Sequence, residues 1–362
     1  MFSFSGLALA ALESRNAVVD SASQLLSKRG SSDSDPSAWS GLFFTAIVLL
    51  NVAVFLPMIL FLGYTLSELI PTIAIVEDDA PLDAPPAYER VALDDKSAHA
   101  DIAKHDVAAE ASEAGATPVL RPVTASLRDT CRLLRSLGGW TSVFRGLRIH
   151  VLANAAIALV TIALSCIPYL PVSVAVLFAS LICVPLNTAW VHVAISSQAS
   201  TSFWSRLSNA KTMYRAAALP TLVYYVAMQV VHMVSYLIAG SPKTLQGEDA
   251  PRGLLAVGVM VLLSVGLLVP AQVVLVRVQA SLLPADDQTI VAVNRAVSAE
   301  GEQRGYMSTG EAWSSFSRAS WVRLLKLYVK TIFVGVAIEL MATSVILLEF
   351  GVIAVIGSMV NK

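Results

Sequence analysis

The chain has 362 residues, of which 56% are hydrophobic and only 14% are charged. Soluble domains carry roughly a quarter charged residues, so this deficit argues against a soluble enzyme or a soluble binding domain. The net charge of −1 excludes a strongly basic nucleic-acid-binding protein, and the mean hydropathy of +0.67 indicates a chain whose solvent is partly lipid.

Composition divides the chain into four parts. Residues 1–39 have a short apolar stretch without a basic region before it, so we expect a flexible tail and no cleaved signal. We expect a first transmembrane span in residues 40–70 and a disordered acidic loop in residues 71–125. The rest, 126–362, is predicted to be a membrane domain with five further spans.

Six stretches are long and apolar enough for helices that cross a membrane, which need about 20 largely uncharged residues. They are 41–66, 151–167, 172–195, 216–239, 254–276 and 331–348. The tail 350–360 either extends the last span or lies on the surface. Four of these spans contain proline, which predicts kinks whose freed backbone groups are satisfied within the protein.

Charges between the spans alternate in a way that predicts their sidedness. Segments 126–148, 196–215 and 318–330 are rich in arginine and lysine, whereas the turn at 168–171 and the segment 240–252 have no excess of basic residues. The positive-inside rule therefore places the three basic segments on one side of the membrane. This pattern predicts an even number of spans and places both termini on the opposite side of the membrane from the basic segments.

The basic segments hold amphipathic patterns. Leu127, Cys131 and Leu134 recur at helical spacing beside arginines, which predicts a helix in the plane of the lipid headgroups. Ser308 and Glu311 form a predicted capping box before AWSSFSRASWVRLLK, a second helix of the same kind. Such clusters of aromatic and basic residues are more often interface anchors than binding sites.

A proline-containing string recurs at the ends of three spans. The strings are PTIAIVED from Pro71, PLNTAWVHVA from Pro185 and PAQVVLVRVQ from Pro270, and a basic, aromatic stretch follows each. The fold class we expect is therefore an all-α membrane protein of about six transmembrane helices, arranged as three two-helix repeats with amphipathic surface helices. Internal repeats are common in transporters.

These strings resemble the signature of the mitochondrial carrier family, in which a proline is followed by an acid, a base and a second base. PAQVVLVRVQ keeps Pro270, Arg277 and Gln279, but Gln272 stands at the acid position and Leu275 at the first base position. In that family the acids and bases form a salt-bridge network that closes a gate. An amide cannot form an ion pair, so the resemblance implies a degenerate carrier, either a divergent transporter or a membrane-organising factor.

The chain as a whole also resembles a group of fungal multi-span membrane proteins commonly labelled "ubiquitin carrier protein". The matching stretches are TIAIVED, PPAYE, RVQASLLP and SRASWVRLLKLYVK. Ubiquitin conjugation needs an exposed catalytic cysteine near a His-Pro-Asn element, and the chain has no such element. Cys131, Cys166 and Cys183 show no spacing typical of a metal site or a disulfide framework. We therefore predict no enzymatic activity, no cofactor and no metal.

A PPxY motif at Pro85, Pro86 and Tyr88 lies in the acidic loop. Proline preorganises a polyproline II strand of the kind that WW domains bind, and WW domains occur in ubiquitin ligases. The alternative function is thus a membrane adaptor or substrate for such a ligase. Because the ligases are cytosolic, this motif favours the outer mitochondrial membrane or another membrane that faces the cytosol.

Polar and ionisable residues within the spans are the remaining candidates for function, because burying them in lipid is costly. They are Glu339, His192, His232, Gln272 and Arg277. For the amides and histidines the alternative is an interhelical hydrogen bond, and Arg277 could extend its charge to the interface. The expected partners are the lipid bilayer and a WW-domain ubiquitin ligase, with no nucleic acid.

Overall fold

The computed structural model describes residues 50–51, 53–77, 122–197, 210–239, 250–284, 287–291, 293, 301 and 304–360. Over these residues the protein is helical and has no strand, so the predicted all-α class is confirmed. The predicted flexible tail, the PPxY motif and most of the predicted acidic loop lie outside the described residues.

Five helical stretches are long and apolar enough to cross a membrane. They are Ala53–Val76, Leu127–Ser165, Ala210–Ile238, Leu255–Ser281 and Arg318–Glu349. A bent pair, α8 (Val172–Ile182) and α9 (Val184–Ile195), passes the same test as one span broken by 59°. Counting that pair, the described residues contain the six spans predicted from sequence.

The first span ends later than predicted, and this corrects the boundary at residue 71. Its helix continues through a π-helical stretch, η1 (Phe61–Leu69), into α3 (Ile70–Val76). Pro71 is the second residue of α3, a position at which a missing backbone N–H is tolerated. All residues of α3 are buried, so burial outweighs the proline as a determinant of where the helix ends. Segment 71–76 is therefore not part of a loop.

The last span also differs from the prediction. Helix α16 (Arg318–Val360) is continuous, so the tail 350–360 extends the span. The predicted second surface helix is divided between α15 (Thr309–Ser314) and the first turns of α16. The capping box of Ser308 and Glu311 is confirmed, since each side chain accepts a hydrogen bond from the backbone N–H of the other.

The chain forms two compact units, which we describe separately. Among the described residues, the first unit contains the first span up to Leu69 and α16 from Tyr328 onward. Asn51 donates a hydrogen bond to the carboxylate of Glu349 (2.6 Å), and Gly335 lies close to Leu62. These two contacts show that the helices run antiparallel.

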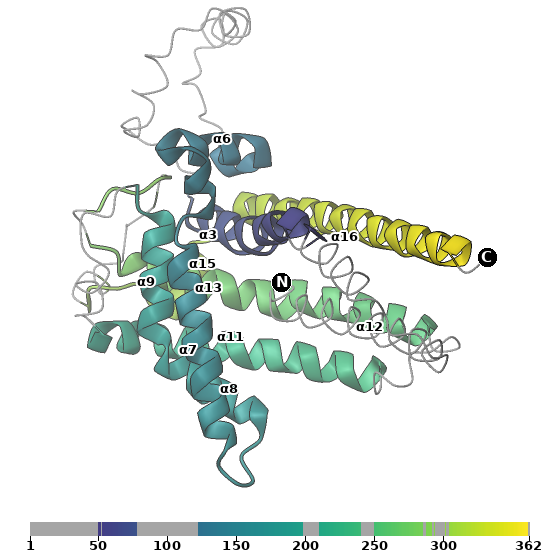
Figure 1. Ribbon diagram of the computed structural model, residues 1–362. Helices are drawn as coiled ribbons and strands as arrows, with labels where there is room; N and C mark the ends of the chain where they lie inside the picture. The colour runs from purple at the N-terminus through teal and green to yellow at the C-terminus, as the bar shows by residue number, and fades with distance from the viewer. Residues whose placement is uncertain are drawn as a thin grey trace, which may run out of the picture. The chain divides into compact units, whose positions relative to one another are not determined.

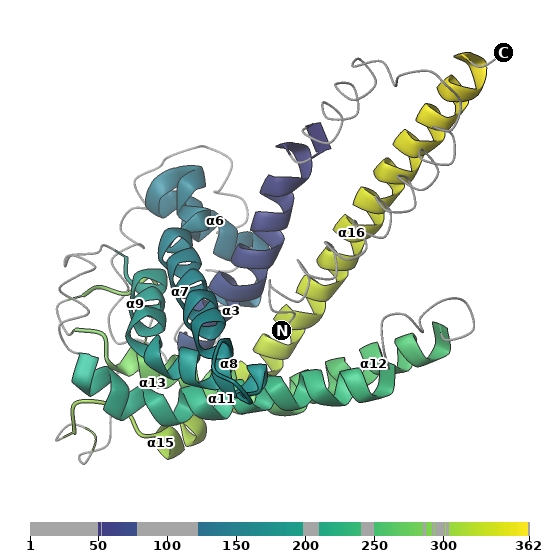
Figure 2. The same cartoon turned by 60° about the horizontal axis from the view of Figure 1, so that its bottom comes forward.

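The second unit, Ile70–Leu327, contains two antiparallel helical hairpins (Figures 1 and 2). Helix α7 (Leu147–Ser165) packs against α8, and α11 (Ala210–Ala239) packs against α12 (Ala250–Leu263). The unit also contains α6 (Leu127–Gly138), the short 3₁₀ helices η2 (Val123–Ala125) and η3 (Gly139–Phe144), and the proline-containing helix α13 (Val269–Ser281).

The bend between α8 and α9 is stabilised by a side chain from another helix. Pro185 at the second position of α9 cannot donate a hydrogen bond to the preceding turn. The hydroxyl of Tyr214, on α11, donates to the carbonyl oxygen of Ile182, the last residue of α8, at 2.6 Å. A hydrogen bond from a neighbouring helix is a common way to satisfy backbone groups at a break inside a membrane.

Replacing Tyr214 with Phe should therefore destabilise the protein by about 1 kcal/mol, the net contribution of a typical hydrogen bond. Thermal unfolding of the purified protein in detergent would measure the change. Tyr236→Phe is the matched control, because Tyr236 lies exposed on the same helix. Equal effects of the two substitutions would contradict the role of the Tyr214 hydroxyl.

Candidate functional site

The three segments that follow the repeated prolines pack against one another. They are α3, α9 and α13, and we call their buried contact region the junction. Most of their residues are buried, whereas the other spans expose many large apolar side chains, as expected for surfaces in lipid. Within the second unit, the recurring strings of the sequence thus form one site.

A helix irregularity precedes each junction segment. The π-helix η1 ends just before α3, the 59° break at Cys183 precedes α9, and a second π-helix, η5 (Ser264–Leu268), precedes α13. Proline removes one backbone donor and clashes with the preceding turn, and a widened or broken turn relieves that clash. An irregular turn therefore precedes the proline-containing helix in all three cases. Two of these turns are π-helical, and π-helical turns are frequent at functional sites.

Two arginines bind the carbonyl groups at the end of α3. Arg323, from the start of α16, donates to the backbone oxygens of Glu77 (2.9 Å) and Ala74 (3.4 Å). Arg277, from α13, donates to the oxygen of Ile75 at 3.3 Å. The last carbonyls of a helix have no intrahelical partner and carry partial negative charge, so a cation is favourable there.

The ends of α9 and α13 are bound in the same manner. Arg145 donates to the oxygens of Val193 (2.8 Å) and Ser197 (3.1 Å) at the end of α9. His192, on α9, lies with Nε2 2.8 Å from the carbonyl oxygen of Gln279 near the end of α13. A basic side chain from another segment therefore binds the C-terminal end of each junction helix.

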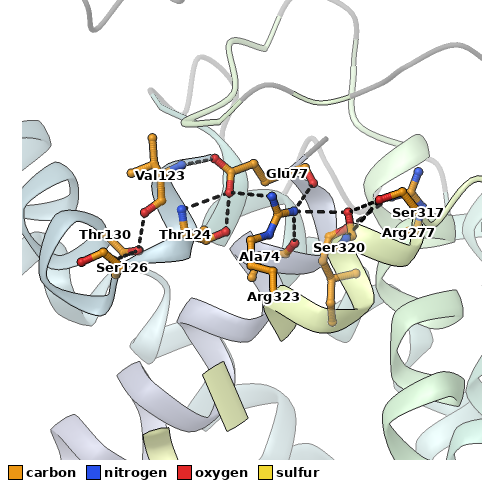
Figure 3. A network of polar contacts seen from close by, with 11 residues as sticks. Ala74, Glu77, Val123, Thr124, Ser126, Thr130, Arg277, Ser317, Ser320 and Arg323 are labelled. Atoms are coloured by element: carbon orange, nitrogen blue, oxygen red, sulfur yellow. Dashed lines mark hydrogen bonds and ion pairs between the residues drawn. The ribbon is translucent and has the colours of Figure 1, made fainter. Parts of the chain in front are cut away.

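A buried carboxylate completes the site at the end of α3 (Figure 3). Glu77 accepts hydrogen bonds from the backbone N–H groups of Val123 (2.7 Å) and Thr124 (3.1 Å) and from the Thr124 hydroxyl. Arg323 forms an ion pair with the same carboxylate at 3.8 Å, and both side chains are less than a tenth exposed. We call Glu77 and Arg323, with the groups they bind, the Glu77 clamp.

The clamp joins three pieces of chain that are far apart in sequence. They are the end of α3, the turn η2 and the first turn of α16. A buried ion pair is tolerated only when hydrogen bonds satisfy the remaining lone pairs and protons. Here two backbone donors and a hydroxyl act on the carboxylate, and two carbonyls and the Ser320 hydroxyl act on the guanidinium.

A short extended piece links the ends of two junction helices. Ile290 donates its backbone N–H to Ile195 at 2.8 Å, and Ser197 donates to the oxygen of Gln288 at 2.7 Å. A further bridge pairs Glu77 with Val293. The described residues of segment 287–293 thus connect the end of α9 with the end of α3.

The structure brings three of the predicted site residues to the junction. His192, Gln272 and Arg277 are buried there on α9 and α13. His192 makes the interhelical contact that we gave as the alternative to a functional role. The interpretation that Arg277 extends to the interface is wrong, because its side chain is only 7% exposed and also bonds Ser315.

The other predicted residues lie elsewhere. His232 is exposed on α11, and Glu339 is exposed on α16 in the other unit. Pro85, Pro86 and Tyr88 are outside the described residues. In the described part of the chain, no group of three histidine, cysteine or acidic residues is placed to hold a metal ion.

The first predicted surface helix is present as α6, with a shifted buried face. Thr130, Leu133 and Leu134 are buried, whereas Cys131 is only partly buried. Arg135 stacks on the ring of the exposed Trp140 at 3.6 Å. The outward face carries the basic and aromatic character expected of an interface anchor.

Sequence reasoning missed the residues of the Glu77 clamp. Glu77 had been assigned to the loop, and Arg323 to a surface helix. The sequence offers one signal, because Glu77 stands at the position that Val191 and Val276 occupy in the other two strings. The approach of η2 and α16 to that acid requires tertiary structure.

Comparison with known proteins gives no match among family models, curated proteins or solved structures. The site is therefore interpreted from its own geometry.

Removal of the Glu77 carboxylate should destabilise the protein strongly. Glu77→Ala leaves the buried guanidinium without its carboxylate and two backbone donors without an acceptor, a loss expected to cost roughly 3–5 kcal/mol. Denaturant unfolding in detergent micelles, followed by tryptophan fluorescence, would measure it. Asp129→Asn, at an exposed position of α6, is the control and should change stability by less than about 0.5 kcal/mol. A similarly small effect of Glu77→Ala would show that the clamp is not formed.

Proposed function

We propose that the chain is a multi-span membrane protein that works without catalysis, as a divergent carrier-like transporter. The observation that supports this proposal is the junction: three spans, each irregular before a proline, converge on one buried polar region. Broken helices and internal repeats are the usual construction of transporters, and irregular backbone at membrane depth is tolerated where protein surrounds it.

The polar contacts that hold the junction together can be broken and formed again, as a gate in a transporter requires. An arginine bound to a backbone carbonyl can exchange that oxygen for water or for a neighbouring carbonyl, and no covalent link has to break. The Glu77 clamp supplies an ion pair although Gln272 and Leu275 stand at the charged positions of the carrier signature. The missing signature charges therefore do not by themselves exclude gated movement.

The role is testable with the purified chain in liposomes. The probes are inorganic phosphate, a dicarboxylate, a basic amino acid and a monovalent cation, each supplied as radiolabel. We expect at least one probe to enter faster than in protein-free liposomes. Glu77→Gln should change that rate at least about threefold, because it weakens the closure by on the order of 1 kcal/mol.

Asp129→Asn is the matched control for the flux measurement and should leave the rate unchanged. Rates equal to those of empty liposomes for every probe, in wild type and in Glu77→Gln, would contradict transport. A change in vesicle size or lipid order without flux would instead support a membrane-organising factor.

A second candidate is an adaptor or substrate of a WW-domain ubiquitin ligase on a membrane facing the cytosol. The PPxY segment leaves the described structure after Glu77 and returns at Pro122, and the Glu77 carboxylate binds the N–H groups of the next residues, Val123 and Thr124. Both ends of the segment are thus held at one place in the second unit.

If the motif is used, Tyr88→Ala should reduce binding of an isolated WW domain at least about tenfold, a loss of roughly 1.4 kcal/mol. Isothermal titration calorimetry on the full chain in detergent would measure the affinity. Pro81→Ala changes a proline of the same segment outside the motif and serves as the control. Unchanged affinity in Tyr88→Ala, or protection of the segment from protease on the cytosolic side of intact organelles, would rule out this role.

A further inference from the structure

Glu68 lies within the first span. Because the helix continues to Val76, this carboxyl lies inside a stretch that is long and apolar enough to cross a membrane. It is the only formally charged residue between Ala53 and Val76. An ionisable residue inside a span is costly and is a candidate functional group by default.

The local backbone around Glu68 is unusual. It belongs to the π-helix η1, in which the Ser67 hydroxyl donates to the oxygen of Leu62 at 2.9 Å. Tyr64 and Thr65, one turn earlier, are both buried. Single π-helical stretches inside α-helices are frequent at functional sites, because the wide turn redirects side chains and changes which carbonyls are bonded.

Helix α16 carries one buried titratable side chain in the same unit, Tyr328, which is 8% exposed. The other titratable residues of α16 in this unit are placed differently. Lys330 and Glu339 are exposed, and Glu349 binds Asn51.

The number of ligands that a bound ion needs favours a proton over a metal ion at Glu68. A hard cation takes six or more oxygen ligands, usually from several carboxylates and carbonyls. Among the described residues no group of three metal-binding side chains is found. A proton needs only one carboxylate.

We propose that Glu68 is an intramembrane proton-binding site that couples solute movement to proton movement. The carboxylate takes one proton from water on one side and becomes a neutral carboxylic acid, and it releases that proton to water on the other side. No electron or other group is transferred. This inference rests on the transport role proposed above.

The position of Glu68 in the chain supplies the coupling. It immediately precedes Leu69 and Ile70, where the helix passes from η1 into the junction segment α3. A junction that opens by changing the helix at Pro71 therefore also changes the wide turn that carries Glu68. Burial of a carboxyl in lipid favours its neutral form, so protonation and the turn's exposure to water are linked.

Chemical labelling tests the site without any measurement of transport. Dicyclohexylcarbodiimide reacts with protonated carboxyl groups in apolar surroundings, and peptide mass spectrometry locates the adduct. In phosphatidylcholine liposomes holding the full chain, we expect Glu68 to be labelled, with a rate that falls about tenfold per pH unit once the carboxyl is mostly ionised. Glu339→Gln, which removes another acid of the spans, should leave this profile unchanged. Absence of labelling at Glu68, or labelling independent of pH, overturns the proposal.

Flux measurements test the coupling itself. An imposed pH gradient should accelerate uptake of the transported probe in wild type and in Glu339→Gln, whereas Glu68→Gln should lose about tenfold or more of that acceleration and keep gradient-free exchange. Glu68→Asp retains an acid and should keep part of the response, which controls for a folding defect. Flux that ignores the gradient in wild type overturns the coupling. No flux of any probe, together with pH-dependent labelling of Glu68, would instead overturn the transport role and leave the proton site standing.

Discussion

The second unit depends on the neutralisation of one buried carboxylate. Glu77 is 4% exposed and ends a helix whose own carbonyls already carry partial negative charge. Without donors this would be an unfavourable place for an anion, because desolvation of an ion costs several kcal/mol. Val123, Thr124 and Arg323 supply those donors, so the position of η2 and the first turn of α16 follows from the charge of Glu77. The clamp thereby fixes the relation of three elements separated by long stretches of sequence.

Throughout the junction, buried polar groups likewise need hydrogen-bond partners. Each proline displaces hydrogen bonds at the start of its segment, and each segment also has unbonded carbonyls at its end. In lipid, water is not available to either set. Side chains from other elements supply the missing hydrogen bonds. Tyr214 does so at the bend before α9, and Arg145 does so at the end of α9. Polar contacts in this protein therefore concentrate where regular helix geometry fails, and the apolar faces of the spans are left for lipid.

Much of the fold could be predicted from the sequence, because transmembrane helices can be recognised by their length and hydropathy. The six candidate spans were accessible in this way, and the capping box of Ser308 was accessible from its own motif. The end of the first span was not, because Pro71 and the acid at position 77 resemble the start of a loop. Only the burial of α3 shows that the helix continues. The error mattered for function, since it placed Glu77 in a loop.

The candidate site was predictable only in part, for a reason that lies in its chemistry. Three polar residues stand out in apolar runs of the sequence: His192, Gln272 and Arg277. The acceptors at the junction cannot be recognised in this way, because most of the contacts there are made to backbone oxygens. A carbonyl oxygen is present whatever side chain its residue carries. The residues that accept these bonds, such as Ala74, Ile75 and Val193, can therefore be exchanged in evolution without loss of the contact, provided that the helix keeps its path. Proteins built on the same junction would then share basic residues and prolines while the rest of their interacting positions drift apart.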